Sequence, residues 1–233
     1  MKNGDAHCYS PRSEPSMAAL KEDRTLPKLS ARTAAMAGAI TLAAVLGWTS
    51  YAFMSSRATD QFAACRSGNV AGGAIGGPVE LVDEAGQTVT DQQIFAKPAL
   101  VYFGFASCAD VCPLDNARNV EVADLLAKDG IDLTPIFISI DPTRDTPEAL
   151  AEYTSGLGEN LQGFTGTIEQ VKAAAAAYKV FFRIPENAAT DYEVDHTTLT
   201  YLVLPQIGFV DFFQRDMSAQ DVAEHAACFL RAN

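Results

Sequence analysis

Two cysteines separated by three residues, Cys108 and Cys112, are the part of the sequence best suited to chemistry. They follow an apolar, β-like run at 99–105 and open a stretch with the pattern of a helix. Side chains four residues apart lie on the same face of a helix, so we expect both sulfurs to point at one atom. A helix N-terminus favours thiolate over thiol, and two neighbouring thiolates suit Cu(I) or zinc. The pair therefore predicts a soft-metal site, although two thiols at this spacing can also form a disulfide.

A third ligand is expected, because two thiolates leave the coordination of a metal incomplete. Beyond residue 60 the chain has two histidines, His196 and His225. His225 falls inside the last expected helix, where an amphipathic position explains it. His196 lies in the segment 192–198 that leads into a late hairpin, and imidazole is a common copper ligand. A single histidine in a loop is more often solvated than bound to metal, so these residues alone leave the third ligand open.

The elements expected around these residues alternate between strand and helix. We expect a β-hairpin at 79–82 and 87–90, strands at 99–105, 133–140 and 180–184, a helix that has Pro113 in its first turn and runs to about 128, helices at 147–155 and 168–178, a hairpin at 199–204 and 209–213, and a last helix at 219–231. A βαβ unit followed by a hairpin and a closing helix is the order of a thioredoxin-like α/β fold, here with an added N-terminal β-hairpin. Such folds carry their reactive cysteines after the first long strand, where Cys108 and Cys112 stand.

Charge is divided unevenly along the 233-residue chain, whose formal net charge is −12. The first 59 residues carry seven Lys or Arg and four Asp or Glu, whereas the remainder carries ten and 25. An acidic body of this kind repels phosphate groups, and no basic patch with aromatic residues offsets that repulsion. The sequence therefore argues against nucleic acid as a partner.

An uncharged stretch of 21 residues, 34–54, has the length of a membrane span. As a helix it would be about 31 Å long, which matches the hydrocarbon core of a bilayer. Trp48 and Tyr51 lie near one end, where aromatic residues favour the membrane interface. We therefore expect a single, uncleaved transmembrane helix; the alternative is a signal peptide that is cleaved after the small residues Ser50 and Ala52.

The flanking charges predict how this anchor is oriented. Basic residues concentrate on its N-terminal side, so the positive-inside rule puts a disordered tail, 1–33, in the cytoplasm. A flexible tether at 55–77, rich in Ala, Gly and Ser, then leads to a folded domain at 78–233. Acidic residues in the tail argue against a mitochondrial presequence. We therefore expect a bacterial inner-membrane protein with its C-terminal domain in the periplasm.

The remaining cysteines differ in their expected surroundings. Cys8 lies in the cytoplasmic tail, where we expect a free thiol. Cys65 and Cys228 would face an oxidising compartment, in which unpaired thiols are prone to oxidation and mispairing. We therefore predict a Cys65–Cys228 disulfide, worth about 4–5 kcal/mol on the chain-entropy model. The alternative is that Cys228 is a buried apolar position in the last helix.

Three segments of the sequence resemble the signature blocks of the Sco/SenC copper chaperones. They read Phe-Gly-Phe-Ala-Ser-Cys-Ala-Asp-Val-Cys-Pro at 103–113, Phe-Ile-Ser-Ile-Asp-Pro-Thr-Arg-Asp-Thr-Pro at 137–147 and Tyr-Glu-Val-Asp-His-Thr at 192–197. Their order and spacing agree with that family too, and the resemblance covers about residues 75–232. One departure is Ala109, where the family commonly has proline; the change leaves both thiols in place and bears more on the rigidity of the loop.

The resemblance implies a membrane-anchored thioredoxin-like domain that helps to deliver copper to the CuA centre of cytochrome c oxidase. It implies Cys108, Cys112 and His196 as the copper ligands, for Cu(I), Cu(II) or both. The implied partners are a copper donor and subunit II of the oxidase, which carries the CuA centre. The chain would then be a metallochaperone rather than an enzyme.

A second hypothesis is a thiol–disulfide oxidoreductase or redox sensor that uses Cys108 and Cys112. Its low-pKa thiolate would attack a disulfide of a partner, and the other thiol would resolve the mixed disulfide. Dithiol exchange needs no further ligand, so the presence of His196 favours the copper hypothesis.

Charged residues near the expected ligands have two interpretations. Asp110 and Asp195 adjoin ligands and could tune them electrostatically or hold a ring nitrogen, or they could be solvated loop residues. Asp141, Arg144 and Asp145 form a polar turn after a buried strand. Helix capping and local ion pairing explain that turn, although partner docking or a role behind the ligands is open.

Overall fold

The structure is a computed structural model that describes residues 31–55, 61–66, 75–185 and 191–233. The chain divides into two compact units, Met1–Ala58 and Thr59–Asn233. In the first unit, helix α1 (Ala31–Ser55) contains the uncharged stretch of the expected anchor. Among the residues that the structure describes, no helix is long and apolar enough to cross a membrane. The anchor and its orientation stay predictions, and both Cys8 and most of the expected tail lie outside the described residues.

The second unit is built on a seven-stranded sheet with the order β2-β1-β5-β4-β3-β8-β9. Its strands are β1 (Glu80–Asp83), β2 (Thr88–Thr90), β3 (Ala99–Gly104), β4 (Thr134–Ser139), β5 (Gln162–Thr165), β8 (Thr200–Leu204) and β9 (Gly208–Phe213). β5, β4 and β3 run parallel, and the other neighbouring pairs are antiparallel. A separate two-stranded sheet pairs β6 (Phe182–Arg183) with β7 (Asp195–His196).

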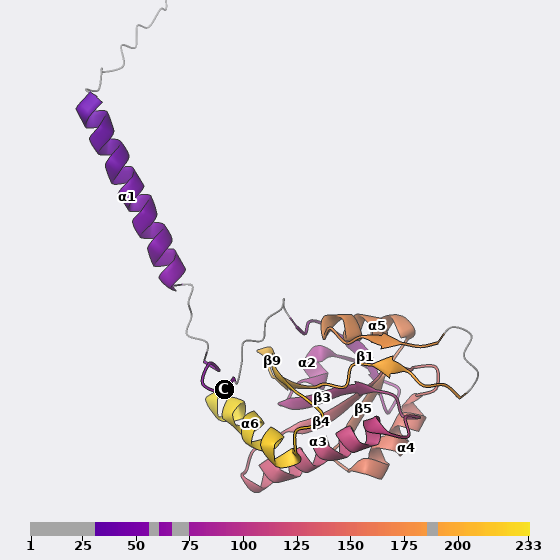
Figure 1. The fold of residues 1–233 in the computed structure, drawn as a ribbon. Coiled ribbons are helices and arrows are strands. Elements are labelled where there is room, and N and C mark those ends of the chain that lie inside the picture. The colour runs from indigo at the N-terminus through magenta and orange to yellow at the C-terminus, as the bar shows by residue number, and fades with distance from the viewer. Residues whose placement is uncertain (1–30, 56–60, 67–74, 186–190) are drawn as a thin grey trace, which may run out of the picture. The chain divides into compact units, whose positions relative to one another are not determined.

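Helices cover both faces of the large sheet (Figure 1). α3 (Val111–Lys128), α4 (Pro147–Leu157) and α6 (Ala219–Ala232) lie on one face, and α2 (Asp91–Ile94) and α5 (Ile168–Ala177) lie on the other. All six residues of β3 and five of the six in β4 are buried, as expected for parallel strands covered on both faces. The C-terminal ends of β3 and β4 are neighbours, so the loops that follow them meet at one edge of the sheet.

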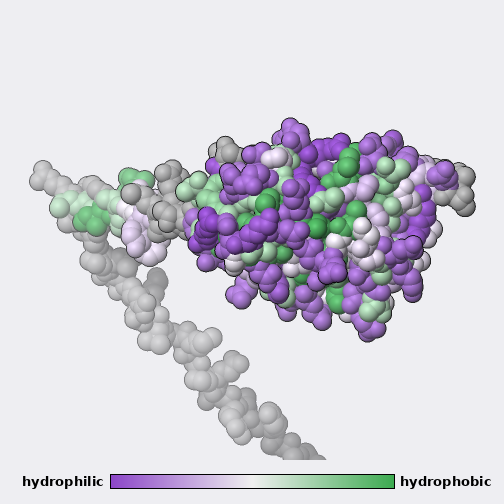
Figure 2. Space-filling model, turned by 90° about the horizontal axis from the view of Figure 1, so that it is seen from below, coloured by the Kyte–Doolittle hydropathy of each residue, from purple (hydrophilic) through white to green (hydrophobic). Residues whose placement is uncertain are grey.

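Several predicted helix starts are confirmed by their caps. The hydroxyls of Thr146, Thr167 and Ser218 each accept a backbone N–H from the first turn of α4, α5 and α6. Seen from the side of α3 and α6, the surface of this unit is mostly hydrophilic, with hydrophobic residues in small separate areas (Figure 2). A hydrophilic surface of this kind agrees with the many charged residues of this part of the sequence.

Some elements differ from the expectation. The sequence does not predict β5, because its four residues include Gly163 and are too few to show an alternating pattern. β5 pairs with β1 on one side and β4 on the other, so the added N-terminal hairpin is part of the main sheet. The expected strand at 180–184 is reduced to the two residues of β6, which pairs outside that sheet.

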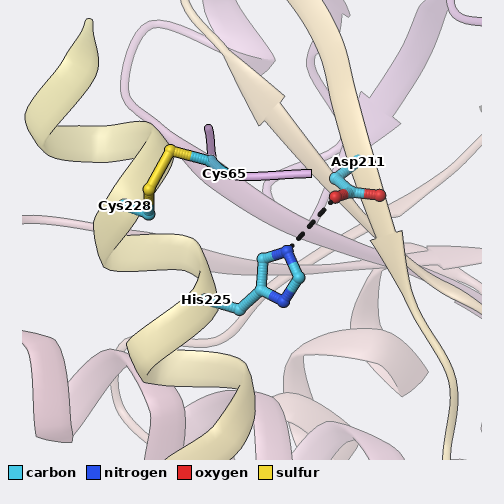
Figure 3. The surroundings of a disulfide bond; sticks show 4 residues. All are labelled: Cys65, Asp211, His225 and Cys228. Atoms are coloured by element: carbon cyan, nitrogen blue, oxygen red, sulfur yellow. Dashed lines mark ion pairs between the residues drawn. A yellow bond between two sulfur atoms is a disulfide. The ribbon is translucent and has the colours of Figure 1, made fainter. Parts of the chain in front are cut away.

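Residues 61–66 pack against α6, within the segment expected to be a flexible tether. Phe62 is buried, and its ring centroid lies 5.3 Å from that of Phe229. Cys65 and Cys228, 163 positions apart, form a disulfide with their Cα atoms 5.6 Å apart (Figure 3). The predicted disulfide is therefore confirmed, and it holds this part of the tether against the domain.

Candidate metal centre

The cysteine pair lies at the junction between β3 and α3. Cys108 stands in the connecting loop, where its N–H donates to the carbonyl of Phe105 in a turn, and Cys112 follows in the first turn of α3. The prediction that both cysteines share one helix face is therefore wrong, because the helix begins only at Val111. The backbone N–H of Cys112 nevertheless donates to Sγ of Cys108 at 3.4 Å, so this sulfur lies at the N-terminus of α3. Both thiols are free and buried.

Gly104, the last residue of β3, leaves the space that the sulfur of Cys112 fills. A Cβ atom at this position would lie 2.9 Å from Sγ of Cys112 and 2.9 Å from the ring of Tyr102. These distances are shorter than van der Waals contact, and Cys112 is fully buried, so a side chain here would displace the sulfur. The sequence offers only a weak signal for this role, a glycine at the end of an apolar run.

His196 lies next to Cys112 and belongs to β7 of the small β6–β7 sheet. Its Nε2 lies 3.6 Å from Sγ of Cys112, although 84 positions separate the two residues. Its Nδ1 lies 2.9 Å from the carbonyl oxygen of Thr197, so Nδ1 donates there and Nε2 keeps the lone pair that a metal requires. The rings of Tyr102 and Phe105 meet the imidazole edge-on, which limits its orientations.

The structure thus brings the three predicted ligands into one region. Sγ of Cys112 and Nε2 of His196 face each other, and Cys108 lies on the adjoining turn. In the described part of the chain, no group of three or more His, Cys, Asp or Glu side chains forms a ready-made metal cage. The arrangement is therefore a thiol–imidazole pair with a second thiol next to it.

Burial decides the protonation of this pair. Burial raises the pKa of the Cys112 thiol well above its usual range, so the expectation that the helix N-terminus makes it a thiolate is wrong for this residue. Burial also lowers the pKa of His196, which keeps the imidazole neutral near pH 7. A neutral imidazole can bind a metal directly, whereas the thiol must first lose its proton. Metal binding at this site therefore releases a proton.

A buried tyrosine and a buried carboxylate lie behind Cys112. The hydroxyl of Tyr102 donates to Sγ of Cys112 at 4.0 Å. Asp115 follows Cys112 by three residues on α3 and is 3% exposed, and its Oδ2 lies 3.7 Å from Nε of Arg215 without a hydrogen-bond partner. Burial raises the pKa of Asp115, although Tyr102 and the guanidinium of Arg118 partly oppose the rise. Sequence reasoning missed this carboxylate, and its i+3 spacing from Cys112 is the signal that could have found it.

The two acidic residues next to the ligands do not contact the imidazole nitrogens. Asp195 is exposed and forms an ion pair with Arg183, and its charge is one of several influences that oppose the lowering of the pKa of His196 by burial. Asp110 is exposed and stands at the N-cap of α3, but its side chain makes no cap hydrogen bond. Of the interpretations that the sequence leaves open, neither residue holds a ring nitrogen, because Thr197 supplies that contact through its backbone.

The polar turn after β4 does more than pair locally. The Nε of Arg144 donates to Asp141 at 2.6 Å, as the sequence suggests. Asp145, which is buried, also accepts the backbone N–H of Ala106 at 3.0 Å, and so contacts the loop that carries Cys108. The turn is therefore packed against the candidate site.

Comparison with known proteins decides the family. The family model described as SCO1/SenC matches residues 68–231, which is well over half of the chain. This chain belongs to the SCO1/SenC family. Protein SenC of Rhodobacter capsulatus is 45% identical over 205 residues, which cover 88% of this chain and 93% of that protein. The mitochondrial SCO1 homolog of Homo sapiens is 40% identical over 162 residues, and the chain spans about half of its length, 53%.

Solved structures of family members have the same fold. A crystal structure of Arabidopsis thaliana ScoI with copper bound gives a TM-score of 0.64 at 33% identity and covers 68% of this chain and 99% of that one. A crystal structure of yeast Sco1 with copper bound gives 0.61 at 37% identity, over 66% and 89% of the two chains. The predicted α/β thioredoxin-like fold is therefore confirmed.

Proposed function

We propose that this SCO1/SenC protein is a copper metallochaperone for cytochrome c oxidase assembly, with Cys108, Cys112 and His196 as its copper ligands. The observation that carries the proposal is the 3.6 Å approach of Nε2 of His196 to Sγ of Cys112. Family members with 33% and 37% identity have structures with copper bound, which supports copper as the cargo.

The ligand set suits a cargo that must be handed on. Two thiolates and one imidazole satisfy Cu(I) in a three-coordinate site, and the imidazole also favours Cu(II). Three ligands leave one side of the metal open, so a ligand of the acceptor can bind before a ligand of the chaperone leaves. In this proposal the acceptor is the CuA site of oxidase subunit II, and a separate protein supplies the copper.

A thiol–disulfide oxidoreductase or redox sensor is the second candidate, and one observation favours it. The N–H of Cys112 contacts Sγ of Cys108, so the two free thiols lie on adjoining turns. Burial and the raised pKa of Cys112 suit a resolving thiol rather than the attacking thiolate, so they do not decide between the two functions. Copper transfer stays the preferred function because Nε2 of His196 faces Sγ of Cys112, and dithiol exchange needs no such ligand.

The proposed location is a bacterial inner membrane, with residues 34–54 as the anchor and the folded domain in the periplasm. The Cys65–Cys228 disulfide supports an oxidising compartment for the domain. Retention of the intact chain in membranes after a high-salt wash is the expected result. A soluble form that begins near residue 53 would instead indicate a cleaved signal peptide.

Copper analysis of the full-length chain tests the proposed ligands. With the thiols reduced, the wild-type protein should bind one copper ion, and Cys108→Ala/Cys112→Ala should bind none. His196→Ala should retain some Cu(I) through the two thiolates but lose nearly all Cu(II), because Cu(II) prefers imidazole nitrogen. His225→Gln is the matched control, since it removes the other histidine of the domain and should leave both oxidation states bound. Equal losses of Cu(II) in the two histidine variants would contradict the assignment.

A further inference from the structure

The turn after β4 is fastened to the loop that carries Cys108. The carboxylate of Asp145 accepts the backbone N–H of Ala106 at 3.0 Å and the hydroxyl of Ser139 at 2.6 Å. The backbone N–H of Ile140 donates to the carbonyl of Gly104 at 2.8 Å. Asp145 and Ile140 are buried, so the end of β4 and the Cys108 loop form one rigid surface.

The same turn is fastened to the segment that carries His196. The guanidinium carbon of Arg144 lies 3.7 Å from the ring centroid of Tyr192, which precedes His196 by four residues, and 5.4 Å from that of Phe105. Asp141, which is fully buried, accepts Nε of Arg144 at 2.6 Å through Oδ2 and the hydroxyl of Tyr192 at 2.9 Å through Oδ1. Arg144 therefore stacks between an aromatic ring from each ligand-bearing segment.

Other contacts also hold the His196 segment. Val194 is buried in the core, and the rings of Tyr102 and Phe105 flank the imidazole. The backbone N–H of Thr197 donates to the carbonyl of Phe181 at 2.9 Å, and its hydroxyl accepts the N–H of Phe181 at 3.0 Å. β6 and β7 pair over only two residues each, and isolated two-stranded ribbons are marginal in water. The ion pair between Arg183 and Asp195 is mostly exposed and so adds little. The ladder also connects His196 only to β6, not to the cysteine loop.

We propose that Arg144 and Tyr192 form a clamp that fixes the imidazole of His196 beside Cys112. Both are positioning residues. Tyr192 is bound by the turn that also binds the Cys108 loop, and Phe105 contacts both Arg144 and the ring of His196. This inference deepens the proposed function, because the clamp would set the third copper ligand. It also assigns a specific role to the polar turn at 141–145, whose role the sequence left open.

Tyr192→Ala in the full-length chain is the direct test, read first without metal. Hydrogen–deuterium exchange of the 192–198 segment should become about tenfold faster or more, while exchange in β3 stays slow. Tyr192→Phe keeps the stacking on Arg144 and loses only the hydrogen bond to Asp141. Its exchange rate should therefore lie between those of the wild type and Tyr192→Ala. Arg183→Gln is the matched control, because it removes an exposed contact of the same segment and should leave the exchange within about twofold of wild type.

The second measurement is copper affinity. Tyr192→Ala should weaken Cu(II) binding about 10–100-fold, as removal of supporting contacts around ligands typically does, and should change Cu(I) binding by the two thiolates by less than about threefold. Normal exchange in Tyr192→Ala would overturn the clamp. Faster exchange with unchanged Cu(II) affinity would overturn its role in positioning the ligand. If the wild-type protein binds copper in neither oxidation state, the proposed function fails instead. In that case, or if it binds only Cu(I), the exchange data alone decide whether the clamp holds His196.

Discussion

Two regions of the domain use the same kinds of residue for different ends. The disulfide region consists of Cys65, Cys228, His225 and Asp211, and the thiol site consists of Cys108, Cys112, His196 and Asp115. In the disulfide region the two sulfurs are bonded to each other across 163 positions (Figure 3). In the thiol site, four positions separate two sulfurs that stay free. Residue type alone therefore does not decide which cysteine pair does chemistry.

The two histidines explain the difference further. The ring of His225 stacks on Phe229 with an interplanar angle of 7°, and its Nε2 faces the carboxylate of Asp211 at 3.5 Å (Figure 3). His196 instead directs Nε2 at the sulfur of Cys112 and donates a hydrogen bond from Nδ1 to a backbone carbonyl. One ring nitrogen of His225 therefore faces a carboxylate in an aromatic setting, whereas one of His196 faces a thiol, which is the arrangement that the proposed copper site needs.

Removal of the disulfide alone should show most clearly whether the two regions have separate roles. Cys65→Ala/Cys228→Ala should lower the free energy of unfolding by about 2–5 kcal/mol, because the disulfide restricts a long loop of the unfolded chain. Its copper content should equal that of wild type, since the disulfide region contributes no ligand to the thiol site. Urea unfolding and metal analysis of the same samples measure both quantities. Loss of copper in this variant, with the fold retained, would show that the two regions are not independent.

The thiol site depends on a backbone position as much as on its ligands. Gly104→Ala should lower the free energy of unfolding by about 1–3 kcal/mol, because the new Cβ would overlap Sγ of Cys112 and the ring of Tyr102. We also expect weaker copper binding, since the sulfur must move away from His196. Gly86→Ala, in an open turn with a positive φ, serves as a control that strains the backbone far from the sulfur. Equal copper affinities for these two variants would contradict the packing argument.

How far sequence reasoning reached can be judged from particular residues. The spacing of Cys108 and Cys112 indicates a soft-metal pair, and a resemblance to Sco/SenC blocks selects His196, which lies against Cys112 in the fold. The sequence could not show that α3 begins after Cys108, because the backbone of the turn that holds Cys108 is not fixed by any residue propensity. The raised pKa of Cys112 follows from complete burial, which depends on the packing of β3 against α3. The clamp joins segments about 50 positions apart, and no local pattern encodes such a contact.

The smallest expected effect concerns the carboxylate in each region. Asp211 faces an imidazole, whereas Asp115 is buried behind Cys112 with one oxygen unpartnered. Because burial raises the pKa of Asp115 in the folded protein above its value in the unfolded chain, folding favours its protonated form. Its contribution to stability is therefore fully present below the unfolded pKa and is lost as the pH rises through the folded pKa.

Asp115→Asn removes this titration while keeping the shape of the side chain. Its free energy of unfolding, relative to wild type, should therefore rise between about pH 4 and pH 7. The gain at pH 7 should be below about 1 kcal/mol, because the guanidinium groups of Arg118 and Arg215 already offset part of the buried charge. Urea unfolding of both proteins at the two pH values measures the difference, in which the titration of groups that Asp115 does not influence cancels. Asp211→Asn removes the corresponding carboxylate of the disulfide region and is the comparison for Asp115→Asn. A relative stability of Asp115→Asn that falls as the pH rises would mean that the two arginines outweigh burial, and the carboxylate behind Cys112 would then be a stabilising ion pair.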